Sequence, residues 1–192
     1  MAKVTNVLLA GVGGQGILLA SEVLSEVLML AGFDVKKNEI HGMSQRGGSV
    51  TSHVRFGEKV YSPIIPEGQA DILFGFELLE TYRYLPLLKA GGKVIVNRLR
   101  IMPPAVATGL ERYPEALEEH IASQVKDTRV VDGQNLAAAA GNPRTVNTVL
   151  LGALSNILDI DETLWSQALE KMVPKKFLSE NIKAFELGRQ SD

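Results

Sequence analysis

The chain has 192 residues, of which 45% are hydrophobic, and this length and composition predict one globular domain with a full core. Its 20 basic and 22 acidic residues give a formal net charge of −2, which leaves no basic excess for holding nucleic acid. It contains no cysteine, which excludes disulfides, a thiolate nucleophile and cysteine-ligated iron–sulfur clusters within these residues.

The chain opens with a strand, a glycine-rich turn and a helix. Residues Val4 to Ala10 read as a nearly all-apolar strand, the pattern of a parallel sheet covered on both faces. An apolar helical pattern runs from Ile17 to Leu30. Between them, Gly11, Gly13 and Gly16 fit the G-x-G-x-x-G spacing. Gly14 and Gln15 lie within the same turn.

This spacing has two interpretations. Glycines let the chain turn sharply, let a ligand approach the backbone and let helix and strand pack closely. The free N–H groups and the dipole of the following helix then favour a phosphate or carboxylate. The alternative is a packing turn without a ligand.

A second strand is predicted from Phe33 to Ile40, which would complete a βαβ unit. Glu39 lies roughly where nicotinamide-binding units place the acid that holds the ribose hydroxyls. We favour the other interpretation, in which Glu39 is a polar strand end.

The segment from His41 to Gly48 is rich in glycine and polar residues, which predicts a loop. It leaves the sheet at the edge where the first glycine turn lies, so the two loops should border one crevice. Arg46 is the expected anion contact, Gly47 and Gly48 would let a ligand come close, and His41 could titrate or donate a hydrogen bond. Capping of loop carbonyls, or pairing with an acid across a subunit contact, is the alternative for His41 and Arg46.

The remaining pattern predicts a mixed sheet and several helices. Alternation over 49–56 followed by Lys59 to Tyr61 predicts an antiparallel hairpin. Glu77 and Asn97 end two further buried strands, where either could line the crevice, although Glu77 could equally serve the dipole of its helix. The other expected elements are strands at 70–76, 93–97 and 128–132, a helix at 77–88 closed by Gly91 and Gly92, a surface loop at 101–109, and helices at 114–124, 134–140, 145–158, after Asp161, and 175–187.

These elements predict an α/β fold, namely a three-layer α/β/α Rossmann-like domain. Its sheet should be mixed and mostly parallel, with an antiparallel hairpin, and helices should follow at the C-terminal end. Gly152 in the 145–158 helix would permit a close helix crossing, whereas the last amphipathic segment could pack on the domain or reach a partner.

The assembled motifs resemble the gamma-type subunit of the 2-oxoacid:acceptor oxidoreductases, and the match covers most of the chain, so we expect residues 1–192 to form one such domain. The HGM-x-QRGG form resembles the small beta subunit of indolepyruvate:ferredoxin oxidoreductase more closely than other branches. The matching segments are GVGGQG at 11–16, EIHGMSQRGGSV at 39–50, Ser62-Pro63, Ala70-Asp71, Phe76-Glu77, and Val96-Asn97 followed by Pro103.

The resemblance implies a subunit of a thiamine-diphosphate-dependent enzyme that oxidatively decarboxylates a 2-oxoacid and reduces ferredoxin. Thiamine diphosphate, its magnesium and the iron–sulfur clusters would lie on larger partner subunits, because this chain has no cysteine and no G-D-G…N segment, and residues 132–135 are too compact to replace it. Ferredoxin would be an indirect partner. The glycine turn, His41, Arg46, Gly47 and Gly48 would border a cleft for coenzyme A or substrate, without a role in proton transfer.

Two other functions are compatible with the sequence. One is a free-standing oxidoreductase that binds NAD(P) or FAD, and the other is a non-catalytic module that binds an anion or nucleotide. No apolar run approaches the roughly 20 residues that span a bilayer, and the start of the chain lacks the apolar core of a secretory signal. We therefore expect a cytoplasmic protein without membrane contact.

Overall fold

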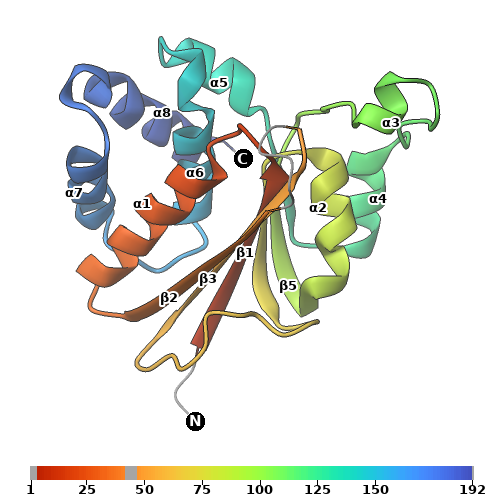
Figure 1. Cartoon of the computed structure of the whole chain (residues 1–192). Coiled ribbons are helices and arrows are strands. Elements are labelled where there is room, and N and C mark those ends of the chain that lie inside the picture. Colours follow the sequence, from red (N-terminus) through yellow and green to blue (C-terminus); the bar gives the residue numbers. More distant parts are fainter. Residues whose placement is uncertain (1–3, 42–46, 192) are drawn as a thin grey trace.

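A six-stranded mixed sheet forms the middle layer of the molecule (Figure 1). The computed structural model describes residues 4–41 and 47–191. The strands are β1 (Val4–Val12), β2 (Asp34–His41), β3 (Ser49–Gly57), β4 (Ala70–Gly75), β5 (Leu88–Asn97) and β6 (Thr128–Val131), in the spatial order β2-β3-β1-β4-β5-β6. Strands β1, β4, β5 and β6 are parallel, whereas β3 is antiparallel to both of its neighbours.

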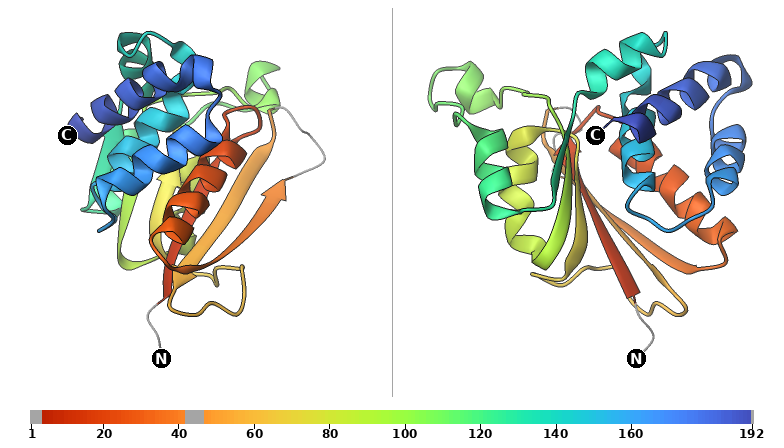
Figure 2. Two further views of the ribbon diagram at one scale, coloured as in Figure 1. Left: turned by 90° about the vertical axis from the view of Figure 1, so that its left-hand side faces the viewer. Right: turned by 180° about the vertical axis from the view of Figure 1, so that it is seen from behind.

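Helices cover both faces of this sheet and complete the predicted three layers (Figure 2). One side carries α1 (Ile17–Leu30), α5 (Gly133–Ala139), α6 (Val146–Ser155), α7 (Glu162–Met172) and α8 (Leu178–Gln190). The other side carries α2 (Leu78–Tyr84), α3 (Pro104–Ala107) and α4 (Leu117–Gln124). Short 3-10 turns cover Leu85–Leu87, Pro143–Thr145 and Lys175–Phe177.

Strand β1 is apolar because it separates two hydrophobic cores. Val7 and Leu9 join the core under α1 and α6, and Leu8 and Ala10 join the core under α2 and α4. All four are fully buried. Successive residues of a strand point to opposite faces, so a central strand between two helical layers must be apolar throughout.

The prediction that residues 49–56 pair with residues 59–61 in a hairpin is wrong about the partner strand. Strand β3 pairs with β2 on one side and β1 on the other, and residues 59–61 form no strand. The Val60 N–H instead donates to Asp34 Oδ2 at 2.9 Å. A hydrogen bond with Lys36, together with this N–H, lowers the pKa of Asp34 to about 2. The segment after β3 is thus held to the start of β2 by a side-chain hydrogen bond and does not join the sheet as a strand.

The predicted βαβ unit also differs from the observed one. Strands β1 and β2 flank α1 in sequence, but β3 lies between them in the sheet. In a nicotinamide-binding unit the acidic residue ends the strand beside the first one. Glu39 lies on the edge strand instead, where its carboxylate pairs with Lys37 at 2.9 Å. This supports the interpretation of Glu39 as a polar strand residue.

The helix after β4 is shorter than predicted. It ends at Tyr84, a 3-10 turn containing Pro86 follows, and β5 already begins at Leu88. Gly91 and Gly92 therefore lie inside β5, where a register shift separates two stretches of pairing with β4, and do not close the helix. Smaller differences are that the predicted 101–109 loop contains α3 and that α4 begins at Leu117, three residues later than predicted.

The close crossing expected at Gly152 is confirmed. A Cβ atom at Gly152 would lie 2.1 Å from the Phe185 carbonyl oxygen of α8. Reciprocally, a Cβ at Gly188 would lie 1.9 Å from the Val149 oxygen of α6. The last helix therefore packs against α6 with its backbone in contact.

Candidate functional site

The glycine turn joins β1 to α1 at the carboxyl edge of the sheet, beside the end of β4 (Figure 1). The chain runs from β1 to one side through α1, while β4 lies on the other side of β1. A doubly wound sheet binds ligands at such a switch point. The topology therefore directs attention to this edge.

Gln15 fastens the turn to the sheet. Its Oε1 accepts a hydrogen bond from the Val12 N–H at 2.6 Å, and its Nε2 donates to the Phe76 carbonyl oxygen at 2.8 Å. Both ends of the amide therefore bind the backbone on either side of the switch point. The sequence placed Gln15 in the turn that would border a cleft, and its observed contacts give it a structural role.

Two kinds of requirement explain the glycines of the turn. A Cβ at Gly11 would lie 2.7 Å from Gln15 Oε1 and 2.8 Å from the Phe76 Cβ, so the fastening by Gln15 needs a glycine there. Gly16 caps α1 with a positive φ of 79°, and no side chain caps that helix end. The first N–H groups of α1 thus keep no side-chain acceptor in the described part of the chain.

Residues Gly47 and Gly48 lie against this turn. The Gly13 N–H donates to the Gly48 oxygen at 2.8 Å, and the Gly47 N–H donates to the Gly13 oxygen at 3.4 Å. The structure therefore brings the two glycine-rich segments together, as the sequence predicted. Exposed His41 ends β2. Arg46 lies outside the described residues.

Glu77 borders a small pocket at this edge, but both of its carboxylate oxygens already accept hydrogen bonds. It is 1% exposed, and its Oε2 caps α2 by accepting the Glu80 N–H at 2.8 Å. Its Oε1 accepts the Ile101 N–H at 3.1 Å and the Tyr113 hydroxyl at 2.6 Å. Burial, and next the hydrogen bond to Glu77, raise the pKa of Tyr113. Glu77 thus caps its helix, as one of the two predictions had it, while it also borders the pocket and holds the segment after β5.

Asn97 was predicted as a possible crevice residue, but it is fully buried. Its Nδ2 donates to the Phe76 oxygen at 3.2 Å, and its Oδ1 accepts the Gly133 N–H at 3.1 Å. It therefore connects the ends of β4 and β5 to the start of α5. The Phe76 carbonyl oxygen accepts hydrogen bonds from both Gln15 and Asn97. The two side-chain amides therefore hold the backbone after β4 in place.

Asn147 borders the turn, although the sequence had indicated only a core helix there. Its Nδ2 lies 3.1 Å from the position of a Cβ on Gly16, and the residue is 9% exposed. Its Oδ1 accepts the Thr148 N–H at 3.0 Å. An amide donor therefore faces the N-terminal end of α1, which no spacing rule could have revealed because Asn147 is far away in sequence.

A small pocket lies at the same edge of the sheet. Its volume is about 250 Å³, and it is bordered by Val12, Gly47, Gly48, Ser49, Glu77, Leu79, Glu80, Arg83, Ile101, Pro103 and Pro104. Residues 47 and 48, which were predicted to border a cleft, thus line one wall. Glu80 and Arg83, which also line it, were not predicted as site residues.

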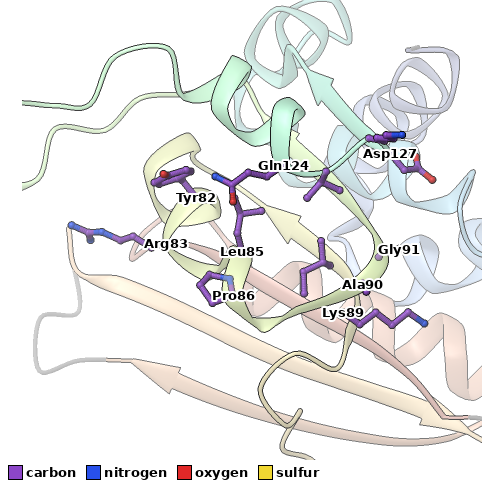
Figure 3. A pocket seen from close by; sticks show the side chains of 13 residues that line it. Tyr82, Arg83, Leu85, Pro86, Lys89, Ala90, Gly91, Gln124 and Asp127 are labelled. Carbon is purple, nitrogen blue, oxygen red and sulfur yellow. The ribbon is translucent and has the colours of Figure 1, made fainter.

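A wider hollow lies elsewhere, between the end of α2 and the end of α4 (Figure 3). Its volume is about 830 Å³, and Leu85, Pro86, Lys89 and Asp127 are among its lining residues. It adjoins the start of β5, whereas α/β sheets bind ligands at the carboxyl ends of their strands. Arg83 extends away from the other labelled side chains of this hollow.

The described part of this edge has donors at the start of α1 and in the amide of Asn147, and two carboxylates, those of Glu77 and Glu80, in the neighbouring pocket. Within residues 4–41 and 47–191, no group of three or more His, Cys, Asp or Glu side chains is arranged to hold a metal ion. In the same part of the chain, no helix is both long and apolar enough to cross a membrane. The glycine turn, the start of α1 and Asn147 together favour an anionic group.

Comparisons with known proteins agree with the resemblance seen in the sequence. The family described as pyruvate ferredoxin/flavodoxin oxidoreductase matches residues 6–191. The chain is 42% identical to indolepyruvate oxidoreductase subunit IorB of Thermococcus kodakarensis, over 97% of this chain and 95% of that protein.

Two solved structures share the fold. The gamma subunit of a keto/oxoacid ferredoxin oxidoreductase from Geobacter sulfurreducens has a TM-score of 0.73 at 23% identity and covers 97% of both chains. The 2-oxoglutarate:ferredoxin oxidoreductase of Magnetococcus marinus has a TM-score of 0.74 at 20% identity. There the match covers 98% of this chain and 31% of the other. The same α/β/α fold therefore occurs both as a separate subunit and within a longer chain.

Proposed function

Because the chain belongs to the pyruvate ferredoxin/flavodoxin oxidoreductase family, we propose that it is the small subunit of a 2-oxoacid:ferredoxin oxidoreductase. The complex would oxidatively decarboxylate a 2-oxoacid to an acyl-coenzyme A and pass the electrons to ferredoxin. The observation that carries the proposal is the 42% identity to an indolepyruvate oxidoreductase subunit over nearly the full length of both chains. Indolepyruvate is therefore the first substrate to test, before other aryl or branched 2-oxoacids and pyruvate.

The residues of this chain do not fit the metal-bound cofactors of such a reaction. Iron–sulfur clusters need cysteine ligands, and the sequence has none. Asp132 and Asn135 lie in the 132–135 segment, which is too compact for a magnesium–diphosphate site, and they bind each other, with Asn135 Nδ2 donating to Asp132 Oδ2 at 2.7 Å. Asp132 also caps α5. We therefore assign thiamine diphosphate, its magnesium and the clusters to a larger partner subunit. Ferredoxin would bind the complex without touching this chain.

The part of this chain in the reaction would be to bind and orient an anionic group. The proposed site is formed by the glycine turn with Gly11, Gly13, Gly14, Gln15 and Gly16, and by the facing segment with His41, Arg46, Gly47 and Gly48. Within it Gln15 holds the turn in place, because both ends of its amide already bind the backbone. The start of α1, which no side chain caps, and the amide of Asn147 support a phosphate of coenzyme A or a 2-oxoacid carboxylate at this place. None of these residues is assigned a proton transfer. The expected location of the complex remains the cytoplasm.

The assembly is tested by anaerobic purification of the chain from its native source. A cysteine-rich, brown partner that reduces viologen with a 2-oxoacid and coenzyme A is the expected result. A colourless chain that comes alone and reduces NAD with a substrate would overturn the proposal in favour of a free-standing oxidoreductase. Ligand binding without any 2-oxoacid-dependent electron transfer, with the larger subunit present, would instead indicate a non-catalytic module.

The anion contact is tested in the purified complex with Arg46→Gln. Loss of a charge-assisted hydrogen bond should raise the KM for coenzyme A or for the 2-oxoacid by about tenfold or more, with kcat little changed. Arg112→Gln, at an exposed position, is the matched control. Unchanged KM values for both substrates in the Arg46 variant would remove Arg46 from the site.

A further inference from the structure

Glu80 is a buried acid whose charge is only partly compensated. It lies in the first turn of α2 and is 4% exposed. Its Oε1 pairs with Arg83 at 2.7 Å, while its Oε2 is buried without a hydrogen-bond partner among the described residues. An unmade hydrogen bond of this kind costs free energy, and the cost is larger for a charged group.

The neighbouring acid, Glu77, has a carboxylate whose two oxygens both accept hydrogen bonds. Glu77, one turn earlier on the same helix end, receives three donors, from Glu80, Ile101 and Tyr113. The side chain of Arg83 is 50% exposed and reaches only one oxygen of Glu80. A second guanidinium, that of Arg100, lies over the Tyr113 ring at 5.9 Å but makes no hydrogen bond to Glu80 among the described residues. The missing partner of Glu80 is a hydrogen-bond donor, and a carboxylate oxygen binds a charged donor more strongly than a neutral one.

Glu80 lines the pocket of about 250 Å³ at the carboxyl edge of the sheet. Ligand sites for whole cofactors usually start at about 300 Å³, and one water takes about 30 Å³ in the liquid. The pocket is therefore sized for one side chain rather than for a cofactor. Its rim includes Pro103 and Pro104, and the adjacent Met102 is 53% exposed. An apolar rim around a buried acid is typical of a pocket that receives an arginine side chain, with its apolar stem and charged end.

We propose that this pocket is the docking site for an arginine side chain presented by the larger subunit of the complex. The guanidinium would donate to Oε2 of Glu80, while Arg83 keeps Oε1. The last torsion of a glutamate is soft, so the carboxylate can turn toward the pocket without leaving its rotamer. A planar guanidinium suits this site because it is weakly hydrated and forms hydrogen bonds at several edges. The identity of the partner rests on the proposed function, but the pocket itself does not.

The pocket is tested on the full-length chain alone, with N-acetyl-arginine amide as the probe in a ¹⁵N NMR titration. The expected result is a saturable shift of the amide signals of Gly48, Ser49 and Glu80. N-acetyl-citrulline amide has the same shape without the charge and should produce no such shift, and Glu80→Gln should abolish the effect of the arginine probe. Equal shifts with citrulline, or an unchanged response in Glu80→Gln, would overturn the proposal.

A second variant guards against a folding defect in Glu80→Gln. Arg83→Met frees Oε1 of Glu80, so it should tighten binding of the arginine probe several-fold, and weaker or unchanged binding would contradict the proposed geometry. Glu119→Gln, at an exposed position of α4, is the control and should bind the probe as the wild type does.

The assignment to the larger subunit is tested by the affinity between the two purified chains. Glu80→Gln should weaken that affinity about tenfold or more, whereas the melting temperature of the free chain stays the same or rises because an uncompensated buried charge is removed. Equal affinity of variant and wild type would overturn the assignment. If the wild-type chain binds no larger subunit at all, the proposed function fails, and a positive arginine titration would still show that the pocket accepts a guanidinium.

Discussion

The crossing of α6 and α8 makes a sharp prediction about stability. In Gly152→Ala, the new methyl group would lie 2.1 Å from the Phe185 oxygen and 3.0 Å from the Arg189 nitrogen. Both obstacles are backbone atoms of α8, so no side-chain rotation can relieve the contact. The two helices must separate by more than an ångström to restore an ordinary distance.

The expected magnitude follows from two opposing effects. Overpacking a well-packed interface costs about 1 to 3 kcal/mol, and a backbone obstacle places this case near 3. Replacing glycine by alanine inside a helix returns about 1 kcal/mol. The net loss is therefore about 2 kcal/mol, which for a chain of this size lowers the melting temperature by about 4 to 8 °C.

Thermal and urea unfolding of the purified chain measure this loss. Gln167→Ala, at an exposed position of α7, is the helix control and should change the free energy of unfolding by less than about 0.5 kcal/mol. Gly188→Ala meets Val149 across the same crossing, so the double variant should cost less than the two single variants combined. A Gly152→Ala chain as stable as the wild type would refute the close approach of the two helices.

Three further variants test the interactions around the site and the sheet. Gln15→Leu leaves a buried backbone N–H without its acceptor and should lower the free energy of unfolding by about 2 kcal/mol, whereas a residue that only bound ligand would change it little. Tyr113→Phe removes a hydrogen bond to the Glu77 carboxylate and should cost about 1.5 kcal/mol in urea unfolding, and an unchanged midpoint would contradict that bond. Burial lowers the pKa of His53, so the unfolded chain binds the proton first and stability falls as the pH drops below about 6.5. His53→Gln should lose this part of the pH dependence in melting curves, exposed His120→Gln should keep it, and equal slopes in both variants would contradict the assignment.

The first part of the fold could be predicted because its signals are local. An apolar run, a glycine turn and a helix of 14 residues follow one another without interruption, and the structure places the helix at 17–30 as predicted. Asp161 likewise caps α7, with its Oδ1 accepting the Thr163 N–H at 2.8 Å. Such caps and periods depend on residues a few positions apart, so no tertiary contact can change them much.

The position of β3 could not be predicted because it depends on contacts distant in sequence. Its alternation indicates a strand with one polar face, and the nearest candidate partner in sequence was 59–61. The observed ladder instead aligns Val54 with Val7 of β1 and with Lys37 of β2. Strand order is decided by which apolar faces meet in the core, and local patterns along one sequence do not reveal which distant strands those are.

The candidate site shows the same division between local and distant signals. The glycine spacing and the second glycine pair were visible in the sequence, and hydrogen bonds between Gly13 and Gly48 now join them. Asn97 was placed correctly at a strand end, but its burial follows from Gly133, which packs against its Oδ1. A polar residue at a strand end can face a ligand or bind a neighbouring loop, and only the fold distinguishes the two.

The helix caps explain why the glycine turn remains suited to a ligand. Helices α2, α5 and α7 each begin with an acid whose carboxylate accepts a backbone N–H of the first turn. Helix α1 begins with Gly16, which has no side chain to do this, while Gln15 turns back to the sheet. The capping energy of about 1 kcal/mol that a serine or aspartate would supply is thus left unused. An anion at this helix end would recover it, so the same glycine that weakens the free helix makes its N-terminus available for binding.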